Sequence, residues 1–514
     1  MKAKICFIVS IGLFISLTSA LAQQRSAKRG VCWDESTQPL TDAPVSKMAP
    51  GVSWYYNWGQ TPQAAGTTLI DAADGMAYVP MCWNGNFNET ALRNYLTSRT
   101  SRLAPQSSLL LGFNEPNLTW NVGGSQMTPQ QAADAWPAVK KVAHDFGLQL
   151  VAPALNFSGD LVGGRVWSPF EWYDEFFRLC PDSGIDYLAF HSYMNWYSAV
   201  NWVASEYFYT DKDNGNLMSA TNRAKYPNLV KFMDDYLTAH GHYPKMFLTE
   251  FCSGEGDKDG YVSSVSSQID QMTQKVQKLE QSDMVAGYAW FMGNTSQAPS
   301  QYPYNSVFRQ NTPGSELSDL GLVYVYMSSF DKEKYYVPGE QILAKDYIDA
   351  SLDNQQVKVR PNTETDSDIP LQVELQSGTL VHYQVSVPKD GDYTLTLHMK
   401  SVAAGAFRVY LDQTGTANMK LKSTLNSTNG LWDDQTVTVP LKAGEHRILL
   451  WNGGAQSMFM NSLHFDAGAT GISPLATHPS TLTDACYTLD GRKVVKGTLP
   501  KGIYINNGKK IIIK

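Results

Sequence analysis

The sequence predicts an α/β protein made of a (β/α)8 TIM barrel, an antiparallel β-sandwich domain and a small C-terminal β tail. Over residues 28–330, short apolar runs alternate with amphipathic stretches, which is typical of strand and helix units around a parallel sheet. In residues 335–467, apolar and polar residues alternate as in antiparallel strands. Residues 475–514 contain two hairpin patterns. We therefore expect three folded parts, with a short Gly-, Ala-, Ser- and Pro-containing linker before the last.

Residues 1–22 have the features of a cleaved secretory signal peptide. Two lysines precede a mostly apolar stretch, and Ala20-Leu21-Ala22 stands before Gln23 as a small-residue cleavage site. No later run approaches the about 18 apolar residues of a membrane-spanning helix. We therefore expect an exported protein without a membrane span.

Charge and cysteine content argue against several partners. The formal net charge is −7, and removal of residues 1–22, which contain two lysines and no acids, leaves 39 basic and 48 acidic residues, a net charge of −9. Such an acidic chain argues against nucleic acid as a partner. The six cysteines form no CxxC pair, which argues against zinc, and we expect no metal or other cofactor. One or two disulfides are compatible with export, and we expect at least one free thiol.

Eight apolar runs predict the strands of the barrel. Eight parallel strands in roughly 300 residues fit a TIM barrel, which typically has about 250 residues and more with insertions. The runs are Gly30–Trp33, Gly51–Trp58, Ala77–Trp83, Leu109–Glu115, Leu148–Leu155, Ile185–Tyr193, Met246–Phe251 and Val285–Met292.

The segment after the fourth run predicts a helix with defined ends. Thr128 can cap it, Pro129 suits its first position, and Gln131 completes a capping box. Gly147 can end it. The aromatic and then polar segment 195–225 is too long for a plain connection, so we expect a loop that lines a cleft.

Two glutamates are the candidate catalytic residues. Glu115 ends the fourth run in an Asn-Glu-Pro motif, and Glu250 lies near the end of the seventh. In a TIM barrel the catalytic groups lie at the carboxyl ends of the strands, and a pair of carboxylates is what glycoside hydrolysis requires. The alternative is that each glutamate only solvates a strand end or pairs with an arginine.

The neighbours of each glutamate suggest its role. Glu115 follows a very apolar strand, where partial desolvation favours the protonated carboxyl, so we expect it to be the proton donor. Asn114 is suited to hold a sugar 2-hydroxyl, and Glu250, as an ionised carboxylate facing the anomeric carbon, suits the nucleophile.

Further candidate substrate-binding residues lie at the ends of other strands. His191 and Tyr193 are two residues apart at the end of the sixth run and should face the same side, where either could bond Glu250 or the sugar. Core packing is the alternative for both. The indoles of four tryptophans could stack on sugar rings or lie in the core. They are Trp58, Trp83, Trp196 and Trp290.

Residues 28–330 resemble glycoside hydrolase family 128, the β-1,3-glucanases of a retaining clan. The resemblance lies in the order and spacing of short motifs. They are Lys28-Arg29-Gly30, Trp54-Tyr55-Tyr56-Asn57-Trp58-Gly59, Val79-Pro80-Met81-Cys82-Trp83, Leu111-Gly112-Phe113-Asn114-Glu115-Pro116-Asn117, Met127-Thr128-Pro129, Ala189-Phe190-His191-Ser192-Tyr193, Leu248-Thr249-Glu250-Phe251 and Tyr288-Ala289-Trp290-Phe291.

Membership of that family would imply a double displacement with retention of configuration. Glu115 would be the acid and base, Glu250 the nucleophile, and Asn57 a substrate contact. The two carboxyl groups would lie about 5–5.5 Å apart. Asn117 departs from the aspartate that is frequent in the family, and we expect this to change subsite contacts rather than the chemistry.

The last two domains resemble other families more faintly. The sandwich is similar in outline to carbohydrate-binding module families 6 and 35, which would make Trp432 a stacking residue, and Lys345 replaces a glutamate that helps those families hold calcium. A purely structural sandwich is the alternative. The tail resembles the sorting domains of type IX secretion, which would place the protein outside, or at the surface of, a Gram-negative cell. Periplasmic location, or a tail that only stabilises, remains open.

The sequence therefore predicts a secreted, monomeric endo-β-1,3-glucanase whose partner is a β-glucan. One alternative is a related retaining hydrolase of β-1,4-glucan, xylan or mannan. Another is a surface protein that binds glycans without cleaving them.

Overall fold

The computed structural model describes residues 25–36, 38–63, 75–99, 107–194, 219–254, 262–294, 304–309, 314–350, 357–402, 407–411 and 427–467, and four strands within 486–513. The predicted signal peptide and Trp196 lie outside these residues. The chain divides into two compact units. The first comprises Met1–Glu333 and Ala344–Val381, and the second comprises Lys334–Leu343 and His382–Lys514.

The first unit is built on parallel strands, and each of the eight predicted runs contains one. Seven strands form one sheet in the order β3-β2-β1-β11-β10-β9-β6, and β4 pairs with β5. The strands are β1 (Arg29–Cys32), β2 (Trp54–Tyr56), β3 (Ala77–Tyr78), β4 (Leu109–Leu111), β5 (Gln149–Val151), β6 (Leu155–Asn156), β9 (Leu188–Ser192), β10 (Met246–Phe251) and β11 (Val285–Trp290).

Isolated bridges connect the β4-β5 pair to its neighbours. Met81, three residues after β3, pairs in parallel with Leu111, and Val151 pairs in parallel with Tyr187 just before β9. All of these strands run in one direction, so their carboxyl ends meet at one edge. Residues that follow different strands can therefore come together there.

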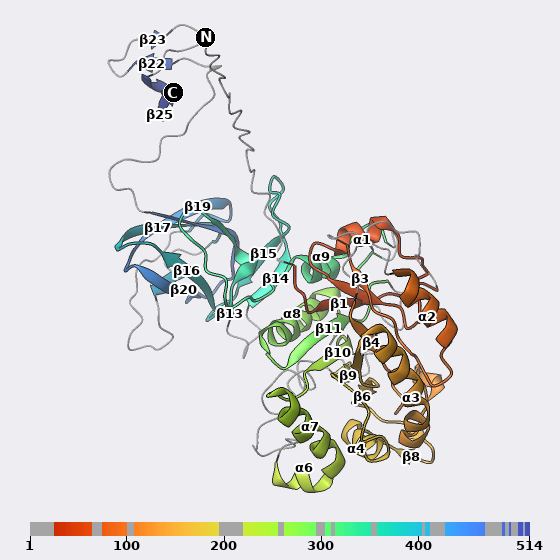
Figure 1. Ribbon diagram of the computed structural model, residues 1–514. Coiled ribbons are helices and arrows are strands. Elements are labelled where there is room, and N and C mark those ends of the chain that lie inside the picture. Colours follow the sequence, from red (N-terminus) through yellow and green to blue (C-terminus); the bar gives the residue numbers. More distant parts are fainter. Residues whose placement is uncertain are drawn as a thin grey trace, which may run out of the picture. The chain divides into compact units, whose positions relative to one another are not determined.

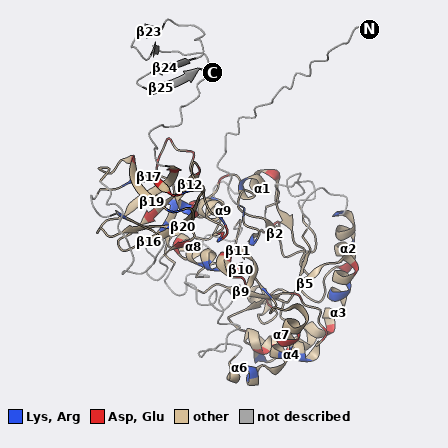
Figure 2. Cartoon of the chain, turned by 60° about the vertical axis from the view of Figure 1, so that its left-hand side comes forward, with Lys and Arg blue, Asp and Glu red and all other residues tan. Residues whose placement is uncertain are grey.

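Helices cover the outside of these strands in Figure 1. Acidic and basic residues both occur on outer helices such as α2 and α3 (Figure 2). Among the described residues no helix is long and apolar enough to cross a membrane. The helices are α1 (Asp42–Met48), α2 (Glu89–Ser98), η2 (Trp120–Val122), α3 (Pro129–Phe146), α4 (Pro169–Leu179), α6 (Ala220–Lys225), α7 (Pro227–His240), α8 (Val265–Gln281), α9 (Asp319–Tyr326) and η5 (Ala344–Asp346), and a small hairpin joins β7 (Leu161–Val162) to β8 (Arg165–Val166).

Helix α3 has the ends that its sequence predicts. Thr128 accepts a hydrogen bond from the backbone of Gln131, whose side chain accepts one from the Thr128 backbone, and Pro129 is the first helical residue. Gly147 ends the helix at φ 63°, in the left-handed region that glycine adopts without a steric cost. Part of the predicted long loop, Ala220–Lys225, is helix α6, and residues 195–218 lie outside the described part of the chain.

The fully buried Arg29 of β1 connects this strand to α8, to β11 and to the end of α9. The Arg29 guanidinium lies 3.1 Å from the Glu280 carboxylate and 3.0 Å from the Tyr288 hydroxyl oxygen. It also donates to the backbone carbonyls of Tyr324 and Ser328, at 2.9 and 2.6 Å. Because the guanidinium has several rigidly placed donors, one side chain holds three segments together.

A hairpin from residues 344–381, which the sequence assigns to the sandwich, groups with the first unit. Its strands are β14 (Val357–Pro361) and β15 (Leu371–Leu375), and it follows β13 (Asp349–Ala350). Asp270 of α8 pairs with Arg360 and Lys358 of β14 at 2.5 and 3.3 Å. These ion pairs connect the hairpin to α8 within the first unit.

The second unit consists of antiparallel sheets. In one sheet β21 pairs with β12 and with β17, and β17 also pairs with β19; in another, β20 lies between β16 and β18. In β17 every second residue, from Tyr393 to Met399, is buried. The strands are β12 (Gln341–Leu343), β16 (Leu380–Val387), β17 (Gly391–Lys400), β18 (Phe407–Leu411), β19 (Trp432–Leu441), β20 (Gly444–Asn452) and β21 (Met458–Ala467).

The C-terminal strands form the two predicted hairpins. The antiparallel order is β23-β22-β24-β25. The strands are β22 (Cys486–Thr488), β23 (Lys493–Val494), β24 (Gly502–Asn506) and β25 (Lys509–Ile513).

Arg29→Met should destabilise the first unit by about 3–5 kcal/mol, because the substitution leaves the Glu280 carboxylate buried without its charged partner. Urea unfolding followed by tryptophan fluorescence measures this loss. Arg178→Met is the matched control, since Arg178 pairs with Glu175 on the surface of α4. Equal unfolding midpoints for the two variants would contradict the role given to Arg29.

Candidate active site

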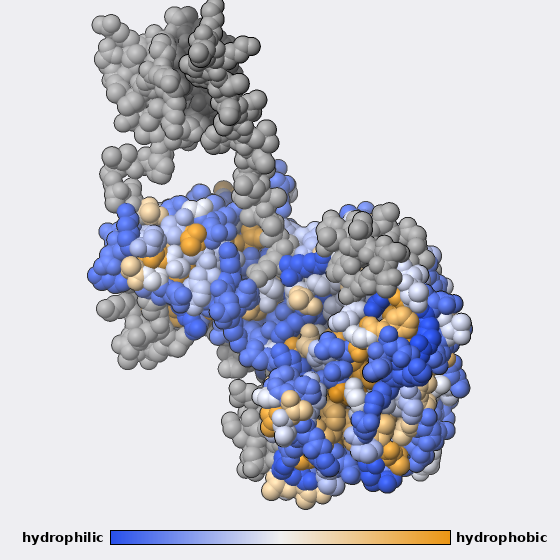
Figure 3. Space-filling view, viewed as in Figure 1, coloured by the Kyte–Doolittle hydropathy of each residue, from blue (hydrophilic) through white to orange (hydrophobic). Residues whose placement is uncertain are grey.

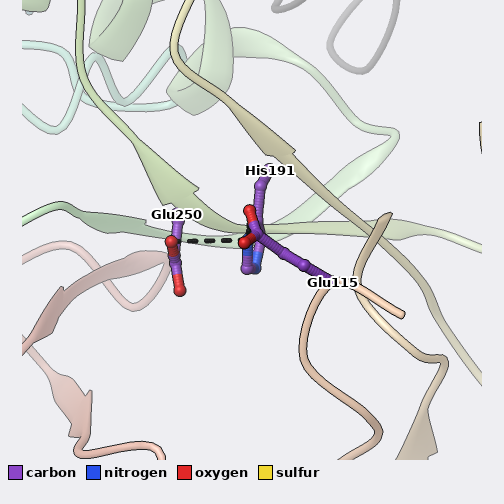
Figure 4. Close-up of side chains that lie close together, drawn as sticks. All are labelled: Glu115, His191 and Glu250. Atoms are coloured by element: carbon purple, nitrogen blue, oxygen red, sulfur yellow. Dashed lines mark hydrogen bonds and ion pairs between the residues drawn. The ribbon is translucent and has the colours of Figure 1, made fainter. Parts of the chain in front are cut away.

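The two candidate catalytic glutamates face each other. Glu115 follows β4 and Glu250 lies in β10, and His191 of β9 lies beside both (Figure 4). One atom of each of the three side chains lies within 4.8 Å of the other two. All three are buried, with exposed fractions of 5% for Glu115, 3% for Glu250 and 0% for His191. Residues far apart in sequence thus form one compact, desolvated cluster.

His191 stands between the two carboxylates. Its Nδ1 lies 2.8 Å from Oε1 of Glu115 and 3.4 Å from Oε2 of Glu250. Its Nε2 lies 2.9 Å from the Thr249 hydroxyl. Both ring nitrogens are therefore engaged, and the imidazole is fixed in orientation.

Glu250 accepts hydrogen bonds at both carboxylate oxygens. Oε1 accepts from the Tyr56 hydroxyl at 3.0 Å and from the Trp58 indole at 2.8 Å, and Oε2 accepts from the Tyr193 hydroxyl. These donors come from the ends of β2 and β9, so the meeting of strand ends builds the site. Hydrogen bonds to a carboxylate favour its ionised form.

Two opposing effects act on Glu250. Burial raises the pKa of Glu250, and the neighbouring Glu115 carboxylate also raises it. His191 and the hydrogen bonds from Tyr193 and Trp58 lower the pKa of Glu250 and offset part of that rise. These side chains therefore tune the pH range in which Glu250 is ionised.

Glu115 is held by its backbone and by Asn156. Its φ of 40° lies in the left-handed region, which is uncommon for a residue with a side chain and often marks a functional site. Its backbone N–H donates to the carbonyl of Ala154 at 2.9 Å. The Asn156 side chain donates to Oε1 of Glu115 at 2.8 Å. The carboxyl group is therefore aimed from two sides.

Asn117 positions Asn156 from within the protein. It is completely buried, and its side-chain amide donates to the carbonyls of Asn156 and Ser158 at 2.8 and 3.1 Å. Its Oδ1 accepts from the Asn156 backbone at 3.1 Å. The two bonds to the carbonyls need an amide donor, which an aspartate lacks. The departure from the family pattern thus lies in the loop that holds Asn156.

The two asparagines predicted to contact substrate differ in their surroundings. The Asn114 amide donates to the Gly123 carbonyl at 3.2 Å, and among the described residues its buried Oδ1 has no hydrogen-bond partner. The Asn57 side chain donates to Glu35 and accepts from the Tyr78 hydroxyl at 2.7 Å. Asn57 therefore organises its own loop, and a contact between Asn57 and a sugar stays a prediction.

The candidate tryptophans fall into different environments. Trp58 and Trp83 are half-buried, and the Trp83 ring centre lies 4.9 Å from that of Trp120. Trp290 is completely buried and donates to the Asn305 carbonyl at 2.7 Å, which is the core packing that the sequence left as its alternative.

In the second unit, the ring of Trp432 lies parallel to that of His398, with centres 5.6 Å apart, and the Lys400 amine lies over it.

Sequence reasoning missed Tyr56, Asn156 and Lys275. Tyr56 and Asn156 end β2 and β6, and the local sequence pattern does not show which strand ends meet. No local pattern indicated a role for the fully buried Lys275 of α8. Its amine donates to the carbonyls of Met194 and Cys252 at 2.7 and 2.8 Å, and so ties together the segments that follow β9 and β10. Burial lowers the pKa of Lys275 to about 7.

Two carboxylates and an imidazole are also ligand types that a divalent cation accepts. Here protein donors engage both oxygens of Glu250, and Thr249 and Glu115 engage both nitrogens of His191. These hydrogen bonds suit groups that share protons. A metal ion at the same place would have to displace them.

Comparison with known proteins agrees with this geometry. The family model described as glycosyl hydrolase catalytic core matches residues 30–214 and 218–324. A glycoside hydrolase family 128 (subgroup II) endo-β-1,3-glucanase from Pseudomonas viridiflava is 30% identical, and the match covers 59% of this chain and 98% of that one, with a TM-score of 0.42.

Two further proteins are similar to smaller shares of this chain. Alkali-sensitive linkage protein 1 of Schizosaccharomyces pombe is 24% identical over 255 residues, 46% of this chain, and the match spans 42% of that protein's length. A β-1,3-glucan-binding family 6 module from Bacillus halodurans is 21% identical and covers 26% of this chain and 100% of its own, with a TM-score of 0.22.

The chain thus contains a glycoside hydrolase catalytic core. Since the family model matches more than half of the chain, the chain belongs to the glycosyl hydrolase catalytic core family, and its sequence similarity there is to family 128.

Tyr193→Phe should raise the pKa of Glu250 further, because it removes a hydrogen bond that favours the ionised carboxylate. A pH titration of ¹³C-labelled glutamate side chains by NMR measures this change. Tyr187→Phe is the control, since the Tyr187 hydroxyl bonds Gln149 at 3.3 Å rather than Glu250. An unchanged or lowered pKa of Glu250 in Tyr193→Phe would contradict this description of the site.

Proposed function

We propose that the protein is a secreted endo-β-1,3-glucanase that cleaves β-1,3-glucan with retention of anomeric configuration. The observation that carries this proposal is the closeness of the two buried glutamates, with an oxygen of each within 4.8 Å of the other. Retaining glycosidases hold their carboxyl groups about 5–5.5 Å apart, whereas inverting enzymes leave about 6.5–9.5 Å for a water molecule.

In the first step Glu115 donates a proton to the leaving glycosidic oxygen while a Glu250 oxygen bonds to the anomeric carbon. The glycosidic bond breaks, and its electron pair stays with the leaving sugar hydroxyl. In the second step Glu115 takes a proton from water, the water oxygen attacks the anomeric carbon, and the Glu250 carboxylate is released. The Asn114 Oδ1 can accept a hydrogen bond from the 2-hydroxyl of the reacting sugar.

The donors around Glu250 support the nucleophile assignment. The Tyr56, Trp58 and Tyr193 side chains stabilise negative charge on Glu250 before attack and after release. His191 touches both carboxylates, so it can adjust its hydrogen bonds as Glu115 loses and regains its proton. These side chains orient the reacting groups and leave the covalent chemistry to the glutamates.

The choice of β-1,3-glucan rests on the sequence relationship. The Pseudomonas viridiflava relative, at 30% identity over nearly its whole length, is an endo-β-1,3-glucanase. We further propose that the Met81–Leu111 and Val151–Tyr187 bridges close the eight strands into a (β/α)8 barrel.

The other parts of the chain would serve delivery and binding. Residues 1–22 support export, and the C-terminal hairpins support a sorting role. In the second unit, antiparallel sheets would form a sandwich that holds glucan near the catalytic domain. There, sugar stacking on Trp432 would require His398 or Lys400 to move off its ring.

Glu250→Ala should abolish turnover, because it removes the carboxylate that bonds to the anomeric carbon in the proposed mechanism. Glu115→Ala should lower kcat/KM about 10²–10⁴-fold, with partial rescue by azide or by aryl glycosides with good leaving groups. Release of reducing sugar and of the aryl group measures both. Glu89→Gln, on the exposed face of α2, is the matched control. Wild-type activity in both site variants would reject the mechanism.

Laminarin and curdlan should release reducing sugar, whereas xylan, mannan and cellulose should not. The first-formed product should be the β-anomer, which ¹H NMR of early reaction mixtures resolves. Products from linear laminari-oligosaccharides should include internal cleavage fragments. Preferred hydrolysis of a β-1,4-glycan would replace the proposed substrate, and binding of laminarin without hydrolysis would favour a surface glycan-binding protein.

A further inference from the structure

The first unit has a cavity that is lined by residues other than the glutamate pair. It has a volume of about 540 Å³, within the range of roughly 300–1,000 Å³ typical of small-ligand sites. Its walls come from the turn Asn84–Asn86 after β3, from Trp120 and the segment Ser125–Met127 after β4, and from one side of α3 at Gln131, Asp134 and Ala135. In that unit, Figure 3 shows a largely hydrophilic face with scattered hydrophobic residues.

The lining has the chemistry of a site for neutral sugars. It contains side-chain amides, one hydroxyl and one carboxylate, which are kinds of group that can hydrogen-bond to sugar hydroxyls. Trp120 adds a flat ring with an exposed fraction of 58%, supported from within by Trp83 at a ring distance of 4.9 Å. An aromatic ring of this kind can stack on a pyranose face. No lysine or arginine is among the described lining residues, so an anionic ligand would find no counter-charge.

One buried group in the cavity wall lacks a partner. Ser125 has an exposed fraction of 2%, and within the described part of the chain its hydroxyl makes no hydrogen bond. A buried polar group without a hydrogen bond costs free energy, which a ligand hydroxyl at this place would recover. This serine points to a polar ligand independently of the aromatic ring.

The cavity shares its walls with the segment that carries the proton donor. The Ser125 backbone donates to the Asn114 carbonyl at 2.9 Å, and the Asn114 backbone donates to the Trp83 carbonyl at 2.9 Å. Asn114 directly precedes Glu115. A bound glucan chain that extends from Glu115 and Glu250 along this wall would reach the cavity.

We propose that this cavity is an additional saccharide subsite, which holds pyranose units of the substrate beyond those at the reacting bond. The inference rests on the proposed function. Binding energy from remote sugar units tightens the complex of long substrates and does nothing for substrates too short to reach. The cavity therefore sets a preference for longer chains.

The test compares the kcat/KM for laminarihexaose with that for a short aryl β-laminaribioside. In Trp120→Ala the ratio of the two values should fall about tenfold. Ser125→Ala should also lower it, and the loss of a buried hydroxyl without a protein partner should not lower the thermal unfolding temperature. Leu161→Ala removes an equally exposed apolar side chain outside the cavity, and the ratio should stay as in the unmodified protein.

An unchanged ratio in both cavity variants would overturn the proposal. If the unmodified protein cleaves neither substrate, the proposed hydrolysis fails, while calorimetric binding of laminarihexaose still decides about the cavity. Weaker binding by Trp120→Ala and Ser125→Ala than by Leu161→Ala then supports the subsite. Equal binding by all three rejects it.

Discussion

The active site depends on placing two carboxylates together where water is scarce. Burial disfavours the charged carboxylate and so raises the pKa of Glu250. Repulsion from the nearby Glu115 carboxylate raises the pKa of Glu250 further. The protein offsets this cost with an imidazole between the two groups and with neutral donors from separate strands. Such an arrangement suits the proposed double displacement, which needs one ionised carboxylate and one protonated carboxyl group.

Buried polar side chains also hold distant segments of the first unit together. Arg29, Asn117 and Lys275 each donate several hydrogen bonds to backbone carbonyls, and each ties together segments far apart in sequence. Backbone groups of loops have no ladder partners, so side chains must satisfy them when the loops are buried. Rigid loop ends in turn hold the reacting groups within the narrow geometry that catalysis tolerates.

Sequence patterns predicted the parts of the structure that depend on neighbours along the chain. The strand runs and the capped helix α3 follow from local sequence patterns. The placement of the two glutamates follows from the rule that catalytic groups lie at the carboxyl ends of parallel strands. The donors Asn156 and Tyr56 escaped because their role depends on which strand ends meet. The core position of Trp290, and the attachment of the β14–β15 hairpin to Asp270, depend on long-range packing for which alternating patterns give no signal.

The amine of Lys275 has three acceptors, Met194 O, Cys252 O and the Ser253 hydroxyl, and as an ammonium it carries three hydrogens for them. Deprotonation, near pH 7, leaves two hydrogens and a lone pair facing three oxygens. The two hydrogens can still serve the Met194 and Cys252 carbonyls, and the Ser253 hydroxyl can donate to the lone pair, but these bonds lose the strength that the positive charge gives them. Mild alkalinity thus weakens the connection between the two segments that carry Tyr193 and Glu250, through a side chain that takes no part in the proposed bond changes.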